Sequence, residues 1–567
     1  MAADLHDNPD AMNPTKLEQP PYWFCPETGI YSSKFTSVQL PLDPFLDAVS
    51  AIFSHRHDGD VALVDSSSGF SISYAELQPL VKSMAAGLHH LMGVKQGDVV
   101  LLVLRNSVYF PVIFFSVLYL GAIVTTMNPS SSLEEIKKQV VDCNAGLAFA
   151  SPDIVEKLGT LGITVIRVPE SCDLGSIQIK NSKFYDIING NFGIVPKPLI
   201  KQDDAAAIMY SSGTTGASKG VLLTHGNLIA AMELFVRFGA SQYEYSSSSC
   251  VYLAVLPMCH IYGLSLFAVG LLSLGSTIVV MRKFDIAEVV RVIERFKITH
   301  FPVVPPMLVA LTKRAQGVCG KSFKSLKQVF SGAAPLSWKF IEDFIQTFPS
   351  VDLIQGYGMT ESTAVGSRGF NTQKFKKYSS VGLLAPNMQA KVADWSSGSF
   401  LPPGSQGELW IRGPGIMKGY LNNPEATQMV IIEDSWLRTG DIAYFDQDGY
   451  LFIIDRIKEI IKYKGFQISP ADLEAVLVSH PGILDAAVTA FSVSHEECGE
   501  IPVAFVVRRP ETTVSEQDVI NYVGAQVAPY KKVRKVFMVN SIPKSPSGKI
   551  LRRELRRILS NSVPSKL

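Results

Sequence analysis

The chain has 567 residues, of which 47% are apolar and 18% are charged, and its formal net charge is +1. At about 150 residues per domain this length predicts several lobes with a large core, and the balanced charge argues against nucleic acid as a partner. The seven cysteines include no C-x-x-C pair, which argues against a disulfide framework or a zinc site and favours a reducing compartment.

The first half of the chain alternates strand-like and helix-like segments. Residues 1–21 are polar and lack the apolar core of a secretory signal, so we expect a loose arm there. The apolar runs 98–104, 121–127 and 145–151 then read as strands, and 133–143 reads as a helix. This alternation predicts an α/β fold, a mostly parallel sheet covered by helices.

Two apolar segments are long enough to resemble membrane spans, which need ~20 residues. Between Tyr245 and Met281 there is no Asp, Glu, Lys or Arg, but glycines and serines interrupt the run and an amphipathic segment, 282–296, follows. We interpret it as a buried helix that leads into a core strand, interpret 108–129 in the same way, and expect no transmembrane span.

The sequence pattern changes twice in the second half. From about Ser379 short β-rich pieces are separated by Gly, Pro and Asp turns, and after Arg456 helices and strands alternate on a small scale. We therefore expect a large N-terminal domain of α/β sheets, residues 1–456, that includes a small β lobe at about 379–456. A small mobile α+β C-terminal domain, residues 457–567, should follow.

The segment "YSSGTTGASKG", residues 210–220, concentrates hydroxyl side chains and glycines around one lysine. Glycines allow positive φ, so the backbone N–H groups can form a nest for phosphate oxygens, and Lys219 can neutralise their charge. The segment is not a Walker A loop. From its residues alone, a phosphate cradle and a flexible Ser/Gly turn are equally open.

Five segments together resemble the motifs of the adenylate-forming superfamily in their usual order. They are "SSGTTGASKG" (211–220), "QGYGMTE" (355–361), "RTGD" (438–441), "DRIKEIIKYKGFQISPADLE" (455–474) and "PKSPSGKILRREL" (543–555). Within that superfamily the chain looks most like plant 4-coumarate:CoA ligases and their peroxisomal ligase-like relatives. The resemblance implies a ligase that uses ATP, Mg²⁺ and CoA: a carboxylate attacks the α-phosphate of ATP, and the CoA thiol then displaces AMP from the acyl-adenylate.

The resemblance also implies roles for single residues. Lys549 stabilises the transferring phosphate, Asp441 accepts both ribose hydroxyls, and Tyr357 stacks on adenine; Asp441 alone would read as a turn aspartate. Thr214 and Glu361 adjoin Mg²⁺, which prefers oxygen ligands. The implied ATP- and AMP-binding residues are Ser211, Ser212, Gly213, Thr214, Thr215, Gly216, Lys219, Gln355, Gly356, Tyr357, Thr360, Asp441, Arg456, Lys458, Lys462, Gln467 and Lys549.

The acid and CoA sites follow from the same resemblance. His260, in "LPMCHIYG", would by itself read as a core histidine, but the resemblance places it beside the substrate carboxylate as an orienter or gate. The acyl pocket is implied for His260, Tyr262, Ala333, Gln355, Gly356 and Thr360, and CoA contacts for Lys283, Lys464 and Gly465.

The basic residues near the C-terminus have two interpretations. On a helix Lys458 and Lys462 would share one face, as solvated surface lysines do; the resemblance instead makes Lys458 the domain hinge and Lys462 a catalytic contact to the nucleotide. The arginines of residues 552–557 are interpreted as a solvated helix face.

Three functions remain open from the sequence. The first is a ligase for fatty acyl, jasmonate-precursor or cinnamate-like acids; Trp410 replaces the cysteine of the corresponding segment in true 4-coumarate ligases, which weakens the hydroxycinnamate assignment. A luciferase-like adenylate oxygenase and a catalytically silent acyl-binding protein are the alternatives. The joint presence of Lys219, Glu361, Asp441, Lys462 and Lys549 argues against silence.

The last three residues, Ser565, Lys566 and Leu567, form the tripeptide that the peroxisomal import receptor reads at a free C-terminus. We therefore expect that receptor as a partner and the peroxisome as the location.

Overall fold

The computed structural model describes most of the chain. The described residues are 22–170, 174, 177–193, 195, 197–211, 218–317, 320–370, 376–463, 466–492, 500–510, 512–545 and 548–562, with the backbone alone described for 177, 178, 320, 321, 462, 466, 467, 492 and 560–562.

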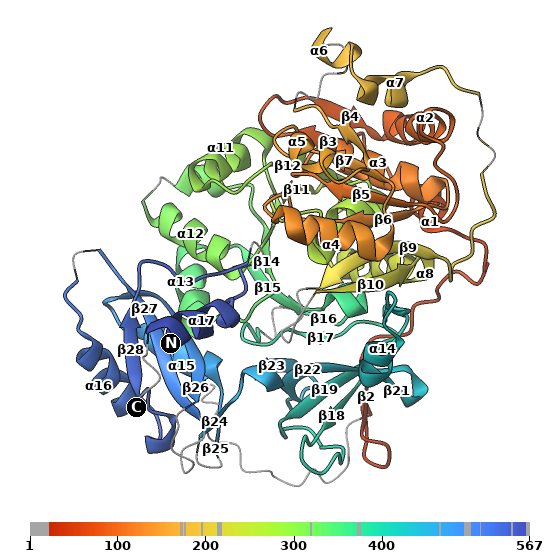
Figure 1. Ribbon diagram of the computed structural model, residues 1–567. Coiled ribbons are helices and arrows are strands. Elements are labelled where there is room, and N and C mark those ends of the chain that lie inside the picture. The colour runs from red at the N-terminus through yellow and green to blue at the C-terminus, as the bar shows by residue number, and fades with distance from the viewer. Residues whose placement is uncertain are drawn as a thin grey trace.

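A seven-stranded sheet forms one layer of the large domain (Figure 1). Its order is β20 (Gly419–Tyr420), β10 (Lys219–Thr224), β9 (Ala205–Ser211), β6 (Ile123–Thr126), β5 (Val99–Val103), β7 (Leu147–Ala150) and β8 (Thr164–Arg167). Strands β9, β6, β5, β7 and β8 are parallel, whereas β10 returns antiparallel to β9. Its helices include α2 (Tyr74–Met92), α3 (Tyr109–Tyr119), α4 (Leu133–Cys143), α5 (Val155–Gly159) and α7 (Lys183–Asn189).

A nine-stranded sheet forms the second layer. Its order is β17 (Leu383–Leu384), β16 (Ser367–Arg368), β15 (Asp352–Tyr357), β14 (Gln328–Ser331), β13 (His300–Val303), β11 (Val251–Ala254), β12 (Thr277–Val280), β3 (Val61–Asp65) and β4 (Ser71–Ser73). Strands β13, β14 and β15 are parallel, so the residues after them meet at one edge of the sheet. The helices between its strands are α11 (Ile286–Phe296), α12 (Pro305–Gln316) and α13 (Trp338–Thr347).

The two apolar segments are interior elements. Helix α3 is buried from Tyr109 to Leu118, and the second segment forms a buried π-helical turn, Leu264–Gly270, before strand β12. Within the described ranges, no helix combines the length and the apolar character that a membrane crossing needs. The interpretation of both segments as buried core is confirmed.

The β lobe is a separate antiparallel sheet of β1 (Phe24–Cys25), β2 (Ile30–Ser32), β18 (Gln389–Ala393), β19 (Gly407–Arg412), β22 (Trp436–Phe445) and β21 (Ile431–Ile432), with β23 (Leu451–Arg456) on β22. The strands before residue 33 join it, which the sequence did not predict because their partners lie some 350 residues away. Trp410 on β19 packs against Phe400 in this lobe, with their ring centres 5.6 Å apart.

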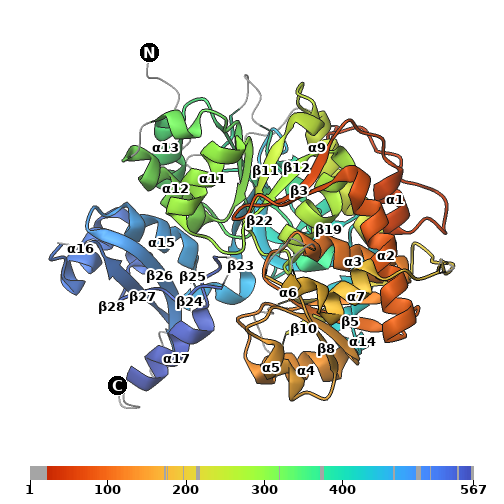
Figure 2. The same ribbon diagram turned by 90° about the horizontal axis from the view of Figure 1, so that it is seen from above.

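The C-terminal domain packs its own core, which includes Leu473, Val488, Val506 and Val519. Its elements are β24 (Ile461–Tyr463), β25 (Phe466–Ile468), α15 (Pro470–Ser479), β26 (Ile483–Ser492), β27 (Glu500–Arg508), α16 (Glu516–Gln526), β28 (Lys535–Met538) and α17 (Arg552–Ser562). It lies beside α12 and α13 of the large domain (Figures 1 and 2). The expected class, a large α/β domain followed by a small C-terminal domain, is confirmed.

Candidate active site

The glycine-rich segment connects two paired strands. Strand β9 ends at Ser211, and β10 begins at Lys219, which lies opposite Ser211 in the antiparallel register. The predicted phosphate-binding residues Ser212, Gly213, Thr214, Thr215 and Gly216 lie outside the described residues. Lys219 is therefore at the base of this loop.

Lys219 joins a buried cluster around Glu361. Its Nζ lies 4.8 Å from the centre of the Tyr420 ring, and the Tyr420 hydroxyl donates to Glu361 Oε1 at 3.0 Å. Burial and the neighbouring Glu361 raise the pKa of Tyr420, so its hydroxyl stays a donor. Glu361 is 7% exposed, and its Oε2 accepts no hydrogen bond from the described residues. A hard cation could bind that oxygen.

Asp441 is held from two sides. It lies opposite Arg456 in the β22–β23 register, with Arg456 Nε 3.3 Å from Asp441 Oδ1, and the Tyr357 hydroxyl donates to Asp441 Oδ2 at 2.7 Å. Burial raises the pKa of Asp441, and Arg456 opposes that rise. The three predicted nucleotide residues thus meet although they come from three motifs.

Lys549 reaches this cluster from the C-terminal domain. Its turn is closed by Gly548 N donating to Ser545 O at 2.8 Å, and Gly548 has φ +78°, which suits glycine. A Cβ on Gly548 would lie 3.0 Å from Cδ of Pro306, so the turn rests against the start of α12. Burial and nearby Arg456 lower the pKa of Lys549 to about 8, while Asp441 and Glu361 oppose that fall.

His260 faces the same space from the large domain. It caps the short helix α10 (Ile261–Gly263), with its Nδ1 accepting from Tyr262 N at 3.4 Å. Protein atoms surround much of the ring, although the residue keeps exposed surface. That crowding and the nearby Lys549 charge lower the pKa of His260 to about 4. His260 is therefore neutral at neutral pH.

Two of the predicted acyl residues, Tyr262 and Gly356, lie against Phe330. The Tyr262 hydroxyl donates to Phe330 O at 3.0 Å, and a Cβ on Gly356 would lie 2.7 Å from the Phe330 ring. Ala333 has φ +71°, a left-handed conformation that a non-glycine residue adopts at a cost, ~1 kcal/mol or more. Gln355 donates from Nε2 to Tyr378 O at 2.6 Å, and Thr360 begins the turn that carries Glu361.

The lysines of residues 458–464 do not share a helix. Lys458 lies in a 3₁₀ turn, Ile457–Glu459, and Lys462 lies on β24 opposite Gln467 on β25, so helical spacing does not apply to them. Burial, Lys219 and Arg456 lower the pKa of Lys458. The side chains of Lys462 and Gln467 and all of Lys464 and Gly465 lie outside the described residues, and Lys283 is exposed between β12 and α11.

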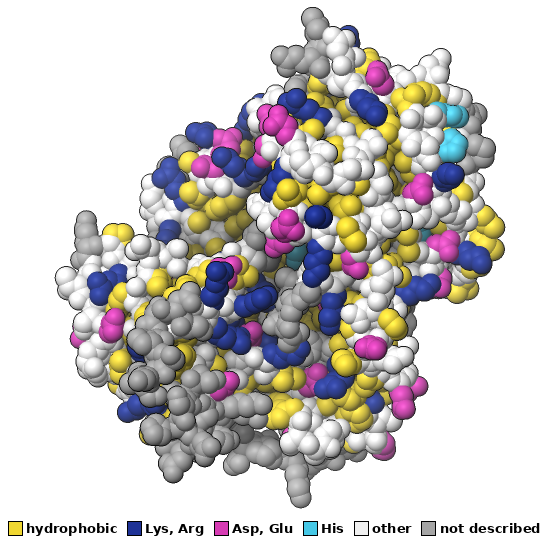
Figure 3. Space-filling view, in the orientation of Figure 1, with side chains coloured by type: hydrophobic (Ala, Val, Ile, Leu, Met, Phe, Trp, Pro, Cys, Tyr) yellow, Lys and Arg dark blue, Asp and Glu magenta, His cyan; other side chains and the backbone are white. Residues whose placement is uncertain are grey.

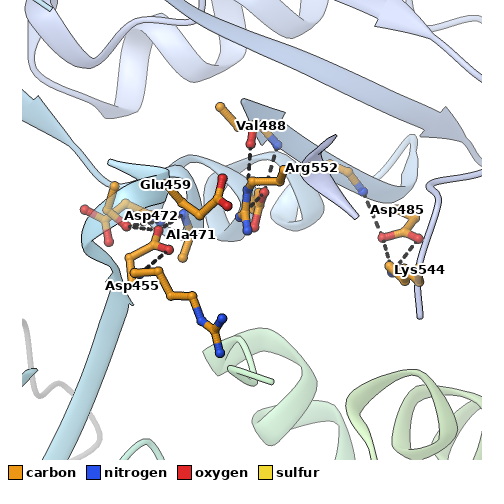
Figure 4. A network of polar contacts seen from close by, with 12 residues as sticks. Asp455, Glu459, Ala471, Asp472, Asp485, Val488, Lys544 and Arg552 are labelled. Atoms are coloured by element: carbon orange, nitrogen blue, oxygen red, sulfur yellow. Dashed lines mark hydrogen bonds and ion pairs between the residues drawn. The ribbon is translucent and has the colours of Figure 1, made fainter. Parts of the chain in front are cut away.

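The interpretation of the C-terminal arginines as a solvated face is wrong for Arg552. Its Nη2 lies 2.7 Å from Glu474 Oε1, and its Nε donates to Val488 O at 3.0 Å (Figure 4). Arg556 pairs with Glu459 beside Lys458. Sequence spacing could not predict these pairs because α15 and the 3₁₀ turn Ile457–Glu459 supply the partners.

Strand β23 is tied to the C-terminal domain by Asp455. Its Oδ2 accepts from Ser469 Oγ at 2.8 Å and from Ala471 N at 3.0 Å (Figure 4). On the outer surface, Lys and Arg side chains gather around the junction of the two domains (Figure 3). This junction suits a polyanionic ligand.

The chain matches known proteins over nearly its whole length. The profile of the AMP-binding enzyme family matches residues 51–421, and that of the AMP-binding enzyme C-terminal domain matches 472–549. The Arabidopsis thaliana protein named 4-coumarate--CoA ligase-like 6 is 75% identical over 566 residues, 100% of both chains. Peroxisomal OPC-8:0-CoA ligase 1 of the same plant is 42% identical, covering 95% of this chain and 98% of its own.

A solved structure of o-succinylbenzoate coenzyme A synthetase from Bacillus subtilis, in complex with ATP and magnesium, has TM-score 0.76 and 25% identity, with 90% of this chain and 99% of that chain covered. The fold is that of adenylate-forming ligases. The chain belongs to the AMP-binding enzyme family and, within it, to the 4-coumarate:CoA ligase-like proteins. Family membership supports an ATP-dependent acid–CoA ligase that works through an adenylate, and the oxygenase and silent-protein alternatives are not favoured.

Proposed function

We propose that this protein activates a carboxylic acid with ATP to an acyl-adenylate, releases pyrophosphate, and transfers the acyl group to CoA. The observation that carries the proposal is the position of Lys549. A lysine from the C-terminal domain enters the electrostatic environment of Asp441, Glu361 and His260, which all belong to the large domain. Such a charge is useful where two anions must meet.

In the first half-reaction, a carboxylate oxygen of the acid attacks the α-phosphorus and the bond to the pyrophosphate oxygen breaks. Asp441 accepts the ribose hydroxyls, Tyr357 stacks on adenine, and Lys549 stabilises the charge on the pentavalent phosphorus. Lys219 and the loop of residues 211–216 hold the leaving phosphates. Neutral His260 orients the substrate carboxylate without adding a charge.

The magnesium ion of this reaction would be held by Glu361 and Thr214. The Oε2 of buried Glu361 accepts no hydrogen bond from the described part of the chain and fits a hard cation, and magnesium bound there would neutralise phosphate charge.

In the second half-reaction, the CoA sulfur attacks the acyl carbon and AMP leaves. We propose that the C-terminal domain turns about Lys458, withdraws Lys549 and presents the β24–β25 hairpin, with Lys462, Lys464, Gly465 and Gln467, to the nucleotide and the pantetheine arm. Lys283 would contact a CoA phosphate.

The substrate is proposed to be a fatty acyl, jasmonate-precursor or cinnamate-type acid, and the location the peroxisome. The relative named as a peroxisomal OPC-8:0-CoA ligase, at 42% identity, supports both proposals. Residues 565–567 lie outside the described residues, so the import proposal rests on that relative and on the tripeptide itself.

A panel of these acids, incubated with ATP and CoA, tests the function. We expect AMP and acyl-CoA to form in equal amounts for at least one acid and only when all three substrates are present. Light emission with luciferin, or binding of acids without AMP release, would contradict the proposal.

A further inference from the structure

A small cavity is lined on one side by Phe330. Among apolar side chains, its lining includes four that carry polar groups, Arg368, His300, Gln328 and Tyr252. The Phe330 ring lies edge-on to Tyr262, with ring centres 5.6 Å apart, and it also lines the cavity. The cavity is therefore next to the place where the far end of an acid would lie.

The guanidinium of Arg368 has no matching negative charge there. Arg368 is 8% exposed and lies on β16 opposite Gly356. Among the described residues no carboxylate lies within 4.0 Å of it. Its hydrogen bonds are long, 3.4 Å to Phe235 O and 3.5 Å to Gln328 Oε1, and its buried Nε has no partner. A buried cation with an unused donor needs an acceptor.

The neighbours of Arg368 do not supply that acceptor. The rings of Phe330, Phe235 and Phe370 face the guanidinium, with their centres 5.2, 5.8 and 5.8 Å from it. Asp352 is connected to Arg368 through Gln328, whose Oε1 accepts from Arg368 and whose Nε2 donates to Asp352 Oδ2 at 3.2 Å. Aromatic faces supply no hydrogen-bond acceptor, so they leave the donor requirement of the buried ion unmet.

Two further observations are consistent with a site that accommodates the charged Arg368 side chain. A Cβ on Gly239 would lie 2.2 Å from Arg368 Nη1, so glycine makes room for the guanidinium. Both nitrogens of His300 are used, Nδ1 with Thr299 Oγ1 and Nε2 with Tyr245 OH, each at 2.8 Å. Burial, Arg368 and Lys327 lower the pKa of His300 to about 3, so it adds no charge.

We propose that Arg368 binds an oxygen acceptor at the far end of the acid, so that the enzyme selects acids that carry a carboxylate or a carbonyl remote from the activated carboxylate. This inference rests on the proposed ligase function. An acid with a methyl end would fill the apolar part of the cavity but leave the guanidinium unpaired, and a site built to hydrogen-bond discriminates strongly against such analogues.

The test is a matched series of acids of equal length that end in a methyl group, a ketone or a carboxylate. The kcat/KM of CoA-dependent AMP release is measured for each acid, over several chain lengths, with the wild type, Arg368→Met and Arg368→Lys. We expect the wild type to prefer an oxygen-terminated acid at least 10-fold at its best chain length. Arg368→Met should reverse that ranking. Arg368→Lys should keep part of the preference for the acid that ends in a carboxylate. Comparing the ketone-terminated with the carboxylate-terminated acid identifies the acceptor.

A wild type that prefers methyl-terminated acids, or makes no distinction, would overturn the inference. So would a ranking that Arg368→Met leaves unchanged, because Arg368 would then serve packing alone. Thermal unfolding checks that the variants fold, and if Arg368→Met does not, the wild-type ranking still decides. If AMP forms from the panel acids without that ranking, this inference fails while the ligase proposal stands.

Discussion

At the scale of single residues, the site depends on charged side chains that are partly buried. Lys549 stands between Arg456, which disfavours its charge, and the carboxylates of Asp441 and Glu361, which favour it. With a pKa of about 8, Lys549 is mostly charged at neutral pH but loses its proton in mild alkali. The rate of adenylation should therefore depend on whether Lys549 is protonated.

The pH dependence of adenylation gives the first prediction. Below the pKa of about 8 Lys549 carries its proton, so kcat/KM for acid-dependent pyrophosphate exchange should be level there and fall about 10-fold per pH unit above it. Lys549→Arg stays charged and should be slower overall but without this alkaline fall. The prediction fails if both proteins lose exchange activity around the same pH.

At the scale of structural elements, two segments of the C-terminal domain should serve the two half-reactions. Lys549→Ala should lower pyrophosphate exchange by orders of magnitude and leave thioester formation from a supplied acyl-adenylate largely intact. Lys462→Ala, its matched counterpart on the β24–β25 hairpin, should do the reverse. Each half-reaction is measured separately. If either variant lost the same share of activity in both half-reactions, the proposed turn of the C-terminal domain between them would be contradicted.

Gly548→Ala tests the docking of the Lys549 turn. Its φ of +78° costs an alanine ~1 kcal/mol or more, and the new Cβ would lie 3.0 Å from Cδ of Pro306. We expect pyrophosphate exchange to fall at least 10-fold while thioester formation from the adenylate changes less than 2-fold. If both stay at the wild-type level, the contact with α12 is not needed for adenylation.

The sequence predicted elements better than contacts between them. Local periodicity identified α4, α11 and the buried α3, and the motif resemblance selected Asp441, Arg456 and Tyr357, which the structure brings together. Both kinds of sequence evidence missed Tyr420, which reaches Glu361 only because β20 pairs with β10, some 200 residues earlier in the chain. Such contacts depend on tertiary packing, which no local pattern contains.

At the scale of the whole molecule, chemistry and location should be separable. Deleting residues 565–567 removes the proposed import tripeptide but no active-site motif. In a chain that ends at Leu567, the truncated protein with an N-terminal fluorescent tag should stay in the cytosol and keep its ligase activity. Continued accumulation in peroxisomes would mean that another segment carries the address.

The central claim is that one cleft forms an acyl-adenylate and then discharges it to CoA. The most direct measurement mixes the protein with an accepted acid and ATP labelled at the α-phosphate, without CoA, and follows the label through one turnover. The account predicts a labelled acyl-adenylate on the protein that disappears, as AMP and acyl-CoA appear together, when CoA is added. Formation of acyl-CoA with ADP, or with AMP but without a labelled adenylate that CoA can discharge, would contradict it.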